Sequence, residues 1–444
     1  MKSKEHLFQY IEQHQDDILH FLSELIQFKA INPRIQPDGG EGEIQSWIAD
    51  RFRDFHFDQV DIWAVDPQGN RPNVVGTIKG TKNLKSLIFN GHCDVVSVTE
   101  SESELWSVDP WRAAIIDGNL YGRGSSDMLA GLTAMIWAGK ALIDTGTKLS
   151  GNLYIESVAG EESQEGQTIG TAATIEKGYT SDFAVVGEPT NCEIVVKTPG
   201  VFHLEIVIKG KKAHISNRNQ VRFPQRGGVP CGSAVGIDAI SKAIPFLQFF
   251  QELEVQWNQR WQDELSAGDI RLQHHGGIGI YTINPCFIEG GSSFGSVPEY
   301  CRLYYAVFYP NWIEEEKAIR EIKDKIHILC SLDDWLVKHP PEINIPSQYS
   351  WKPMREISPD HVGVRALARS HTEVFATDPV YSVFKGLTDA TFLSQAGVPT
   401  VLFGPGSLDR GTHGPNEHVP IQQVIDATKT YAALALNYLS DPDT

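Results

Sequence analysis

Residues 87–96 read LIFNGHCDVV, a short apolar run that is followed at once by a histidine and an aspartate. The run from Leu87 to Phe89 predicts a buried β-strand. Stretches with helical spacing separate it from further β-rich runs at residues 153–158, 183–186 and 400–403. This alternation indicates an α/β domain with a mostly parallel sheet and helices on both faces.

The pattern changes at about residue 199. Between Phe202 and Ile208 apolar and polar residues alternate, as expected for a strand with one exposed face. The elements that follow have the order β-α-β-β-α-β, which predicts a ferredoxin-like layer. We therefore expect a catalytic domain in two parts, residues 1–198 and 358–444, with a second domain inserted at residues 199–357.

The composition limits the partners and the location of the chain. It has 444 residues, of which 41% are hydrophobic, and a formal net charge of −18. Nucleic acid and acidic membrane surfaces attract basic proteins, so neither is expected as a partner. The six cysteines form no CxxC pair, and no apolar run is long enough for a signal peptide or a membrane span. We expect a soluble, cytoplasmic protein that acts on a small molecule.

Five potential metal ligands follow the predicted strands or open a helix. They are His92, Asp127, Glu162, Glu188 and His413. In an open α/β sheet the ligand site lies beyond the carboxyl ends of the strands, so these side chains are expected at one edge. Two oxygen-bridged divalent cations need one shared carboxylate, and each needs a further carboxylate and an imidazole. The chain offers that set once.

Two acidic residues beside these ligands have expected roles. Asp94 is two residues from His92, so it faces the same side of an extended chain and can accept a hydrogen bond from the imidazole. Glu161 adjoins Glu162, and it can act as general base while its neighbour binds metal. The alternative for the acidic pair is an exposed helix start, which the helix dipole favours.

Five segments together resemble the co-catalytic zinc hydrolase family of acetylornithine deacetylase, succinyl-diaminopimelate desuccinylase, aminoacylase and glutamate carboxypeptidase. The segments follow the family's order through most of the chain and comprise residues 91–96, 122–128, 161–162, 187–190 and 413–417. The resemblance implies a zinc aminopeptidase-like catalytic domain with an inserted lid and dimerisation domain. It also implies a cis peptide bond after Asp127.

The resemblance assigns the ligands to two sites. Asp127 would bridge two divalent metal ions. His92 and Glu188 would complete one site, while the other would be completed by Glu162 and His413. Zinc is the expected metal, and cobalt or manganese also accept such mixed nitrogen and oxygen ligands.

The resemblance also assigns roles around the metals. Glu161 would be the general base, and Asp94 would support His92. His214 matches a family histidine that reaches the active site of the partner subunit and stabilises the oxyanion. A homodimer through the lid domain follows from that match. From the residues alone, His214 is equally well interpreted as a polar loop residue.

The chain departs from the family on the substrate side. Gly291 and Gly295 lie in a segment that resembles the substrate-binding loop, but Gly295 stands where asparagine is usual. Phe308 stands where many members carry an arginine that clamps a substrate carboxylate. Our hypothesis is that Arg218, Arg222 or Arg226 binds an anionic substrate group instead. The alternative is a solvated basic loop.

The predicted activity is hydrolysis of the amide bond of a small N-acylated amine or amino acid. In this reaction Glu161 would take a proton from the attacking water and return it to the departing amine. Two alternatives stay open. One is a dipeptidase or carboxypeptidase of the same family, and the other is a non-catalytic binding protein on the same fold.

Overall fold

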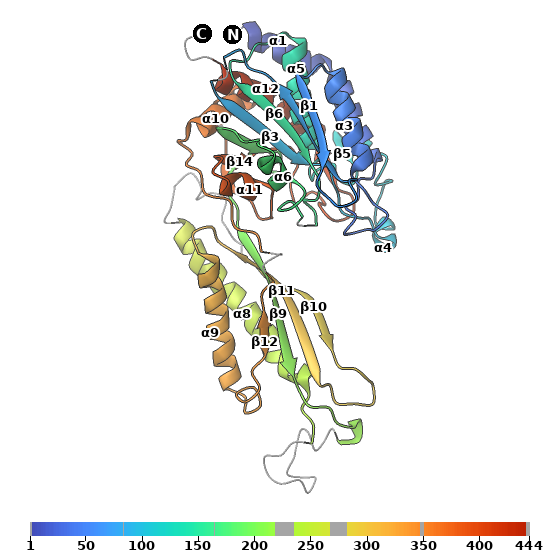
Figure 1. The fold of residues 1–444 in the computed structure, drawn as a ribbon, viewed down its shortest axis with the longest axis vertical. Helices are drawn as coiled ribbons and strands as arrows, with labels where there is room; N and C mark the ends of the chain where they lie inside the picture. Colours follow the sequence, from blue (N-terminus) through green and yellow to red (C-terminus); the bar gives the residue numbers. More distant parts are fainter. Residues whose placement is uncertain are drawn as a thin grey trace. The chain divides into compact units, whose positions relative to one another are not determined.

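The computed structural model describes residues 2–82, 84–163, 165–217, 235–266, 282–346 and 350–440. The chain divides into two compact units, and Figure 1 labels many of their helices and strands. The main unit comprises Met1–Lys197, Met354–Phe384 and Thr388–Thr444. The inserted unit comprises Thr198–Pro353 and Lys385–Leu387.

The main unit is built on an eight-stranded sheet with the order β1-β2-β6-β3-β7-β14-β8-β13 (Figure 1). Its strands are β1 Gln59–Ala64, β2 Pro72–Ile78, β3 Ser86–His92, β6 Asn152–Val158, β7 Phe183–Val186, β8 Ile194–Lys197, β13 Tyr381–Val383 and β14 Thr400–Leu402. The central strands β6, β3, β7 and β14 are parallel to one another. Strands β1 and β2 are antiparallel at one edge, and β8 is antiparallel to β14. The prediction of a mostly parallel sheet is confirmed.

Helices cover both faces of this sheet, as neighbouring residues of β3 show. Phe89 contacts Tyr431 of α12, whereas Ile88 packs in a cluster with Leu393 of α11. Successive side chains of a strand point to opposite faces, so α12 and α11 lie on opposite sides. The layer that contains α12 Ile421–Leu439 also holds α1 Lys2–Gln13, α2 Gln15–Gln27, α5 Leu129–Asp144 and α10 Val362–Phe375. The other face carries α6 Thr171–Glu176 and α11 Ala390–Gln395. Helix α3 Gly42–Asp54 packs on β1 and β2 on the side of α2, where its Trp47 contacts Phe21.

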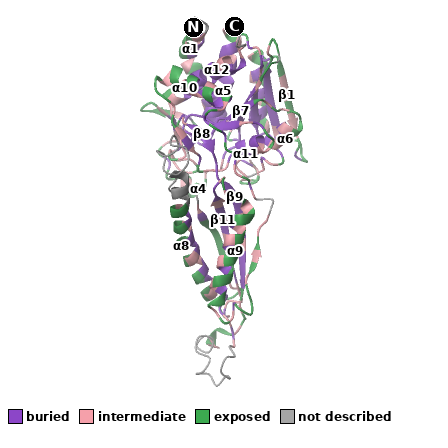
Figure 2. Cartoon of the chain, turned by 90° about the vertical axis from the view of Figure 1, so that its left-hand side faces the viewer, coloured by how far each residue is buried: buried purple, intermediate pink, exposed green. Residues whose placement is uncertain are grey.

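Helix α5 is buried along almost its whole length, and Figure 2 shows the surrounding core in purple. Each fully buried leucine or isoleucine contributes about 1.5–3 kcal/mol relative to an exposed one. The helix approaches the sheet very closely at Gly131, where a Cβ atom would lie 1.9 Å from the main-chain oxygen of Gly187. Only glycine fits there. This contact holds the start of α5 against the end of β7, and both of these chain positions adjoin predicted metal ligands.

A three-stranded sheet completes the main unit. It has the order β15-β5-β4, from β4 Ala114–Ile116, β5 Asn119–Tyr121 and β15 His418–Pro420. The short helix α4 Glu100–Ser103 precedes it in the chain. The pairing of β15 with β5 brings the residues after His413 beside the turn that leads to Asp127.

The inserted unit is a four-stranded antiparallel sheet with two helices (Figure 1). The elements are β9 Gly200–Lys209, α8 Ala239–Ser266, β10 Ile283–Gly290, β11 Tyr300–Tyr309, α9 Glu315–Ser331 and β12 Glu342–Asn344. The strand order β10-β11-β9-β12 and the β-α-β-β-α-β sequence of elements are those of a ferredoxin-like layer. The predicted second layer is therefore confirmed. Within the described ranges, no helix combines the length and the apolar character that crossing a bilayer requires.

Candidate metal centre

The predicted ligands of the main unit follow the ends of neighbouring strands. His92 is the last residue of β3 and lies opposite Val158, the last residue of β6, in the parallel register. Glu162 lies in the turn after β6, and Glu188 lies two residues after β7. Parallel strands end at the same edge of a sheet, so these side chains converge. Asp127 precedes α5, and His413 lies between β14 and β15.

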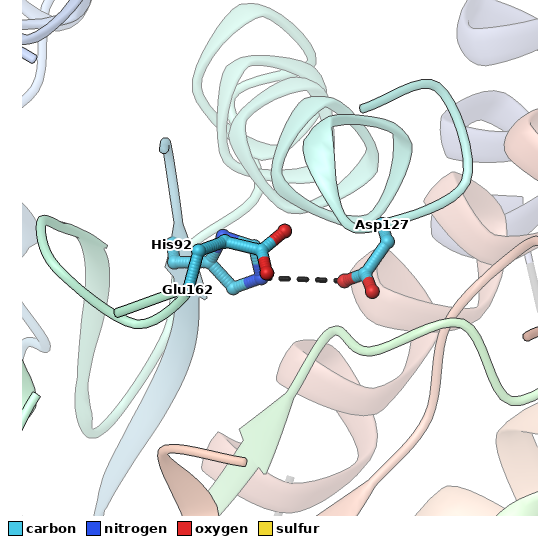
Figure 3. Close-up of side chains that lie close together, drawn as sticks. All are labelled: His92, Asp127 and Glu162. Atoms are coloured by element: carbon cyan, nitrogen blue, oxygen red, sulfur yellow. Dashed lines mark hydrogen bonds and ion pairs between the residues drawn. The ribbon is translucent and has the colours of Figure 1, made fainter. Parts of the chain in front are cut away.

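Asp127 lies between the two imidazoles. Its Oδ1 atom is 3.3 Å from Nε2 of His92, and its Oδ2 atom is 3.5 Å from Nε2 of His413. The ligand atoms of His92, Asp127 and Glu162 all lie within 4.8 Å of one another (Figure 3). Glu162 in turn lies 2.9 Å from Nε2 of His413. The single carboxylate of Asp127 is thus placed to serve two cation positions.

The imidazole of His92 is oriented for metal binding. Its Nδ1 atom lies 2.9 Å from the main-chain oxygen of Asp94, which can only accept a hydrogen bond. In a neutral ring the proton therefore sits on Nδ1, and the lone pair of Nε2 faces Asp127. Two acceptors at 3.3 Å repel unless a proton or a cation lies between them. A divalent cation at this place satisfies both atoms.

The site concentrates negative charge in a buried place. Within the described part of the chain, no lysine or arginine pairs with Asp127, Glu161, Glu162 or Glu188. Burial raises the pKa of Glu161 and of Glu188 well above the ordinary value, and neighbouring carboxylates raise it further. Glu188 is 2% exposed, and its Oε1 atom has no hydrogen-bond partner among the described residues. These donors fit divalent cations, which would compensate the charge and use the unpaired oxygen.

Nearby carboxylates change the pKa of both histidines. Burial lowers the pKa of His92, but the hydrogen bond to Asp127 and the surrounding acidic groups raise it well above its usual value. Burial also lowers the pKa of His413, and the hydrogen bond to Glu162 together with nearby charges raises it to about 9. Without metal, protons on these rings balance part of the negative charge.

The side chain of Asp94 does not make the predicted hydrogen bond with His92. Its carboxylate lies 3.8 Å from Nδ1 of His92, beyond hydrogen-bonding distance, because other donors already occupy it. Oδ1 accepts from the amides of Gly160 and Glu161 at 3.0 and 3.2 Å, and Oδ2 accepts from Glu162 at 3.1 Å. A further bond of 2.7 Å comes from Asn32 Nδ2. Asp94 supports His92 through its main-chain oxygen, and its side chain fixes the turn that carries the acidic pair.

The buried ion pair of Arg123 and Glu417 holds Asp127 in place, a role that the sequence pattern did not indicate. Glu417 Oε1 accepts from the amides of Ser126 and Asp127, each at 3.0 Å. Its Oε2 atom accepts from Gly124 at 3.0 Å and from Nη1 of Arg123 at 2.7 Å. Arg123 and Glu417 are each 1% exposed. The peptide bond from Asp127 to Met128 is cis, as the resemblance implied.

The remaining predicted residues belong to the inserted unit. His214 is exposed and forms an isolated bridge with Ser296, beside Gly295, whose oxygen accepts from Ile215 at 2.9 Å. Gly291 has a positive φ of 76° and donates to the oxygen of Tyr300. The structure thus brings His214 and the glycine-rich segment together. Arg218, Arg222 and Arg226 lie outside the described residues.

Comparison with known proteins identifies the family. The sequence model described as Peptidase family M20/M25/M40 matches residues 88–437. The chain belongs to this M20 family. It is a metal-dependent amidohydrolase, and its His/Asp/Glu cluster lies where the sheet positions a metal site.

Among curated relatives of this M20 protein are N-formyl-4-amino-5-aminomethyl-2-methylpyrimidine deformylases. The one from Bacillus subtilis (strain 168) is 33% identical over 441 residues, covering 97% of this chain and 96% of the relative. The succinyl-diaminopimelate desuccinylase of Gluconacetobacter diazotrophicus is 25% identical and covers 90% of this chain and 92% of its own. Human carnosine dipeptidase 1 has the same fold, with a TM-score of 0.68 at 17% identity over 98% of this chain and 99% of that chain.

Metal binding should release protons. In metal-free protein at pH 7.5 the His413 imidazole, with a pKa of about 9, carries a proton that a cation must displace. Affinity should therefore rise at least about tenfold per pH unit from about pH 7 to 9, since His413 and His92 can both lose a proton. Calorimetric titration with zinc, in buffers of different ionisation enthalpy, should count at least one proton released. His413→Ala should lower the count, and a pH-independent affinity without proton release would contradict the assignment.

Proposed function

We propose that this amidohydrolase removes the formyl group from an N-formylated aminomethyl heteroaromatic amine, such as the pyrimidine named in its curated relatives. The full-length similarity to two such deformylases, at 33% and 31% identity, supports the proposal. The observation that carries it is the side chain at position 308. An arginine at this position could bind a substrate carboxylate, and a phenylalanine cannot.

Phe308 lies in β11 on the face that α8 does not cover. Tyr305 contacts Phe250 of α8 with ring centroids 4.7 Å apart, and residues three apart on a strand face opposite sides. Phe308 is partly exposed and pairs with Val201, and Ala306 pairs with His203. Neither residue can clamp a carboxylate as an arginine does. A formylated aminomethylpyrimidine has no carboxylate, which fits this surface.

Two divalent metal ions are part of the proposal. His92 and Glu188 would hold one, Glu162 and His413 the other, and Asp127 would bridge them. When bound, such ions polarise both a water molecule and the scissile carbonyl group. Zinc suits the ligand set, and cobalt or manganese are alternatives that metal analysis separates.

Glu161 is the proposed general base. Asp94 fixes its main-chain amide at 3.2 Å, and its burial keeps the carboxylate basic. In the proposed reaction Glu161 takes a proton from the attacking water as the new bond to the formyl carbon forms. The C–N bond then breaks, and Glu161 gives the proton to the amine nitrogen. The products are formate and the free aminomethyl compound.

His214 is the proposed donor to the oxyanion. The main-chain amide of Ser216 donates to Nδ1 of His214 at 3.2 Å, so the neutral ring carries its proton on Nε2. An exposed Nε2 proton is suited to stabilise negative charge on the carbonyl oxygen of a substrate. We propose that it acts on the active site of the partner subunit.

The proposed homodimer forms through the inserted unit. Strand β10 is an edge strand of its sheet, and Phe287 and Ile288 on it are 71% and 57% exposed. An edge strand with apolar side chains offers unpaired main-chain groups to a second strand. A second copy of β10 supplies a matching surface because a two-fold interface uses the same patch twice.

Glu161→Gln should lower kcat for the formylated pyrimidine about 10²- to 10⁴-fold, because the amide cannot accept the proton. Zinc content should stay at the parent level, since Glu161 is not a proposed ligand. Formate release and metal analysis measure both. Glu176→Gln, an exposed change in α6, is the matched control and should behave as the parent does. Retention of kcat in Glu161→Gln would remove the proposed base.

Phe308→Arg should shift the substrate preference toward carboxylates. We expect kcat/KM for N-formyl and N-acetyl amino acids to rise about tenfold relative to the formylated pyrimidine, through a new charge-assisted hydrogen bond. Phe308→Leu is the control and should leave the preference unchanged. A parent enzyme that already prefers N-acyl amino acids or dipeptides would overturn the uncharged-substrate assignment and favour the deacylase or dipeptidase alternative.

Catalysis across subunits is tested by complementation. His214→Ala and Glu161→Gln chains should each be inactive alone. When co-expressed with different tags they should recover about a quarter of the parent activity, because half of randomly paired dimers hold one intact site. Purification through both tags isolates the mixed dimer. If the mixed dimer is as inactive as its parents, His214 acts within its own chain.

A further inference from the structure

A short turn, which we call the base loop, carries both Glu161 and Glu162. It comprises residues 160–163 and 165 of the described chain. The side chain of Asp94 holds its beginning through three amide hydrogen bonds. The amide of Glu165 closes the turn onto the oxygen of Gly160 at 2.8 Å. The end of the loop is therefore set by the position of Glu165.

The carboxylate of Glu165 is held from three sides. Arg71 Nη1 lies 2.6 Å from Oε2, and Ser163 Oγ donates to the same oxygen at 2.8 Å. Arg34 Nε donates to Oε1 at 2.9 Å. The side chain of Glu165 is 17% exposed, whereas that of Arg34 is 73% exposed. An exposed ion pair contributes little, so Arg71 is the partner that fixes Glu165.

Arg71 is itself anchored in the main unit. Its side chain is 9% exposed, and Nε and Nη2 donate to both oxygens of Glu41 at 2.8 and 2.7 Å. Glu41 is fully buried directly before α3. Such a two-point pair fixes the plane of the guanidinium. Arg71 Nη2 would also lie 3.3 Å from a Cβ atom at Gly160, so the guanidinium approaches both ends of the base loop.

We propose that Arg71 and Glu165 are positioning residues for catalysis. Their ion pair fixes the end of the base loop, as Asp94 fixes its beginning, and so directs the carboxylates of Glu161 and Glu162. The inference rests on the proposed function in naming Glu161 as the base and Glu162 as a metal ligand. A second consequence concerns Glu162. If the base loop is misplaced, Glu162 binds its metal ion more weakly. Two supports on a loop of this length leave the acidic pair little freedom to move.

The test changes Glu165 and leaves Arg71 intact. Loss of Arg71 would leave the buried carboxylate of Glu41 without its partner and would destabilise the fold. In Glu165→Ala, kcat should fall about 10- to 100-fold while KM changes by less than about twofold. Affinity for the more weakly bound zinc ion should fall about tenfold. Glu165→Gln keeps an oxygen that can accept from Arg71 and should recover most of the loss in kcat.

Arg34→Ala is the matched control. It removes an ion pair to the same carboxylate but keeps the contact with Arg71, so kcat should stay within about twofold of the parent. Thermal unfolding of each variant separates a folding defect from misplacement. The inference is overturned if Glu165→Ala keeps either kcat or zinc affinity within twofold of the parent. Equal losses in Arg34→Ala, or no recovery in Glu165→Gln, overturn it as well.

The outcome can be separated from failure of the proposed function. If the parent does not hydrolyse the formylated pyrimidine, the substrate assignment fails. The same variants are then compared on any amide that the parent cleaves. The calorimetric zinc titration needs no substrate, so an unchanged affinity in Glu165→Ala contradicts the positioning role whichever amide the enzyme hydrolyses.

Discussion

The structure depends on the repulsion among carboxylates that the sheet brings together around Asp127. Glu188 is buried, Glu161 and Glu162 are half-buried, and no described lysine or arginine pairs with any of the three. A buried charge without compensation costs several kcal/mol. Protons on the two imidazoles supply part of the compensation, and bound divalent cations would supply the rest. The affinity for metal is therefore a consequence of how the main unit folds.

Holding mutually repelling groups together requires rigid supports, and these supports lie outside the ligand set. Glu417 and Arg123 fix the turn before Asp127, and the side chain of Asp94 fixes the start of the base loop. The carboxylates of Glu417 and Asp94 accept hydrogen bonds from main-chain amides, and Arg123 donates to Glu417. Amides of a turn have fixed directions, so a carboxylate that accepts two or three of them defines the path of the chain. Part of the stability of the fold is used to keep the site in one arrangement.

Much of the site could be predicted from sequence because strand ends are local features. An apolar run followed by His92 predicts a polar residue at the sheet edge, and the same reasoning finds Glu162 and Glu188. The roles of Arg123 and Glu417 could not be predicted in this way. They are 294 residues apart, and a charged residue gives no sign in the sequence that it will be buried with a partner. The side-chain contact expected of Asp94 was wrong for a related reason, because the competing amides become its neighbours only on folding.

The fold determines the reaction class more strongly than it determines the substrate. The succinyl-diaminopimelate desuccinylase of Gluconacetobacter diazotrophicus is 25% identical to this chain, while the deformylase of Bacillus subtilis is 33% identical over nearly the whole chain. The proposed metal ligands lie near strand ends and their charges must be balanced, so they tolerate little change. The face of β11 that bears Phe308 has no such constraint, because an arginine or a phenylalanine fits a partly exposed strand equally well. Selection for a new substrate can therefore act there without disturbing the metal centre, and a substrate without a carboxylate removes the reason to keep an arginine.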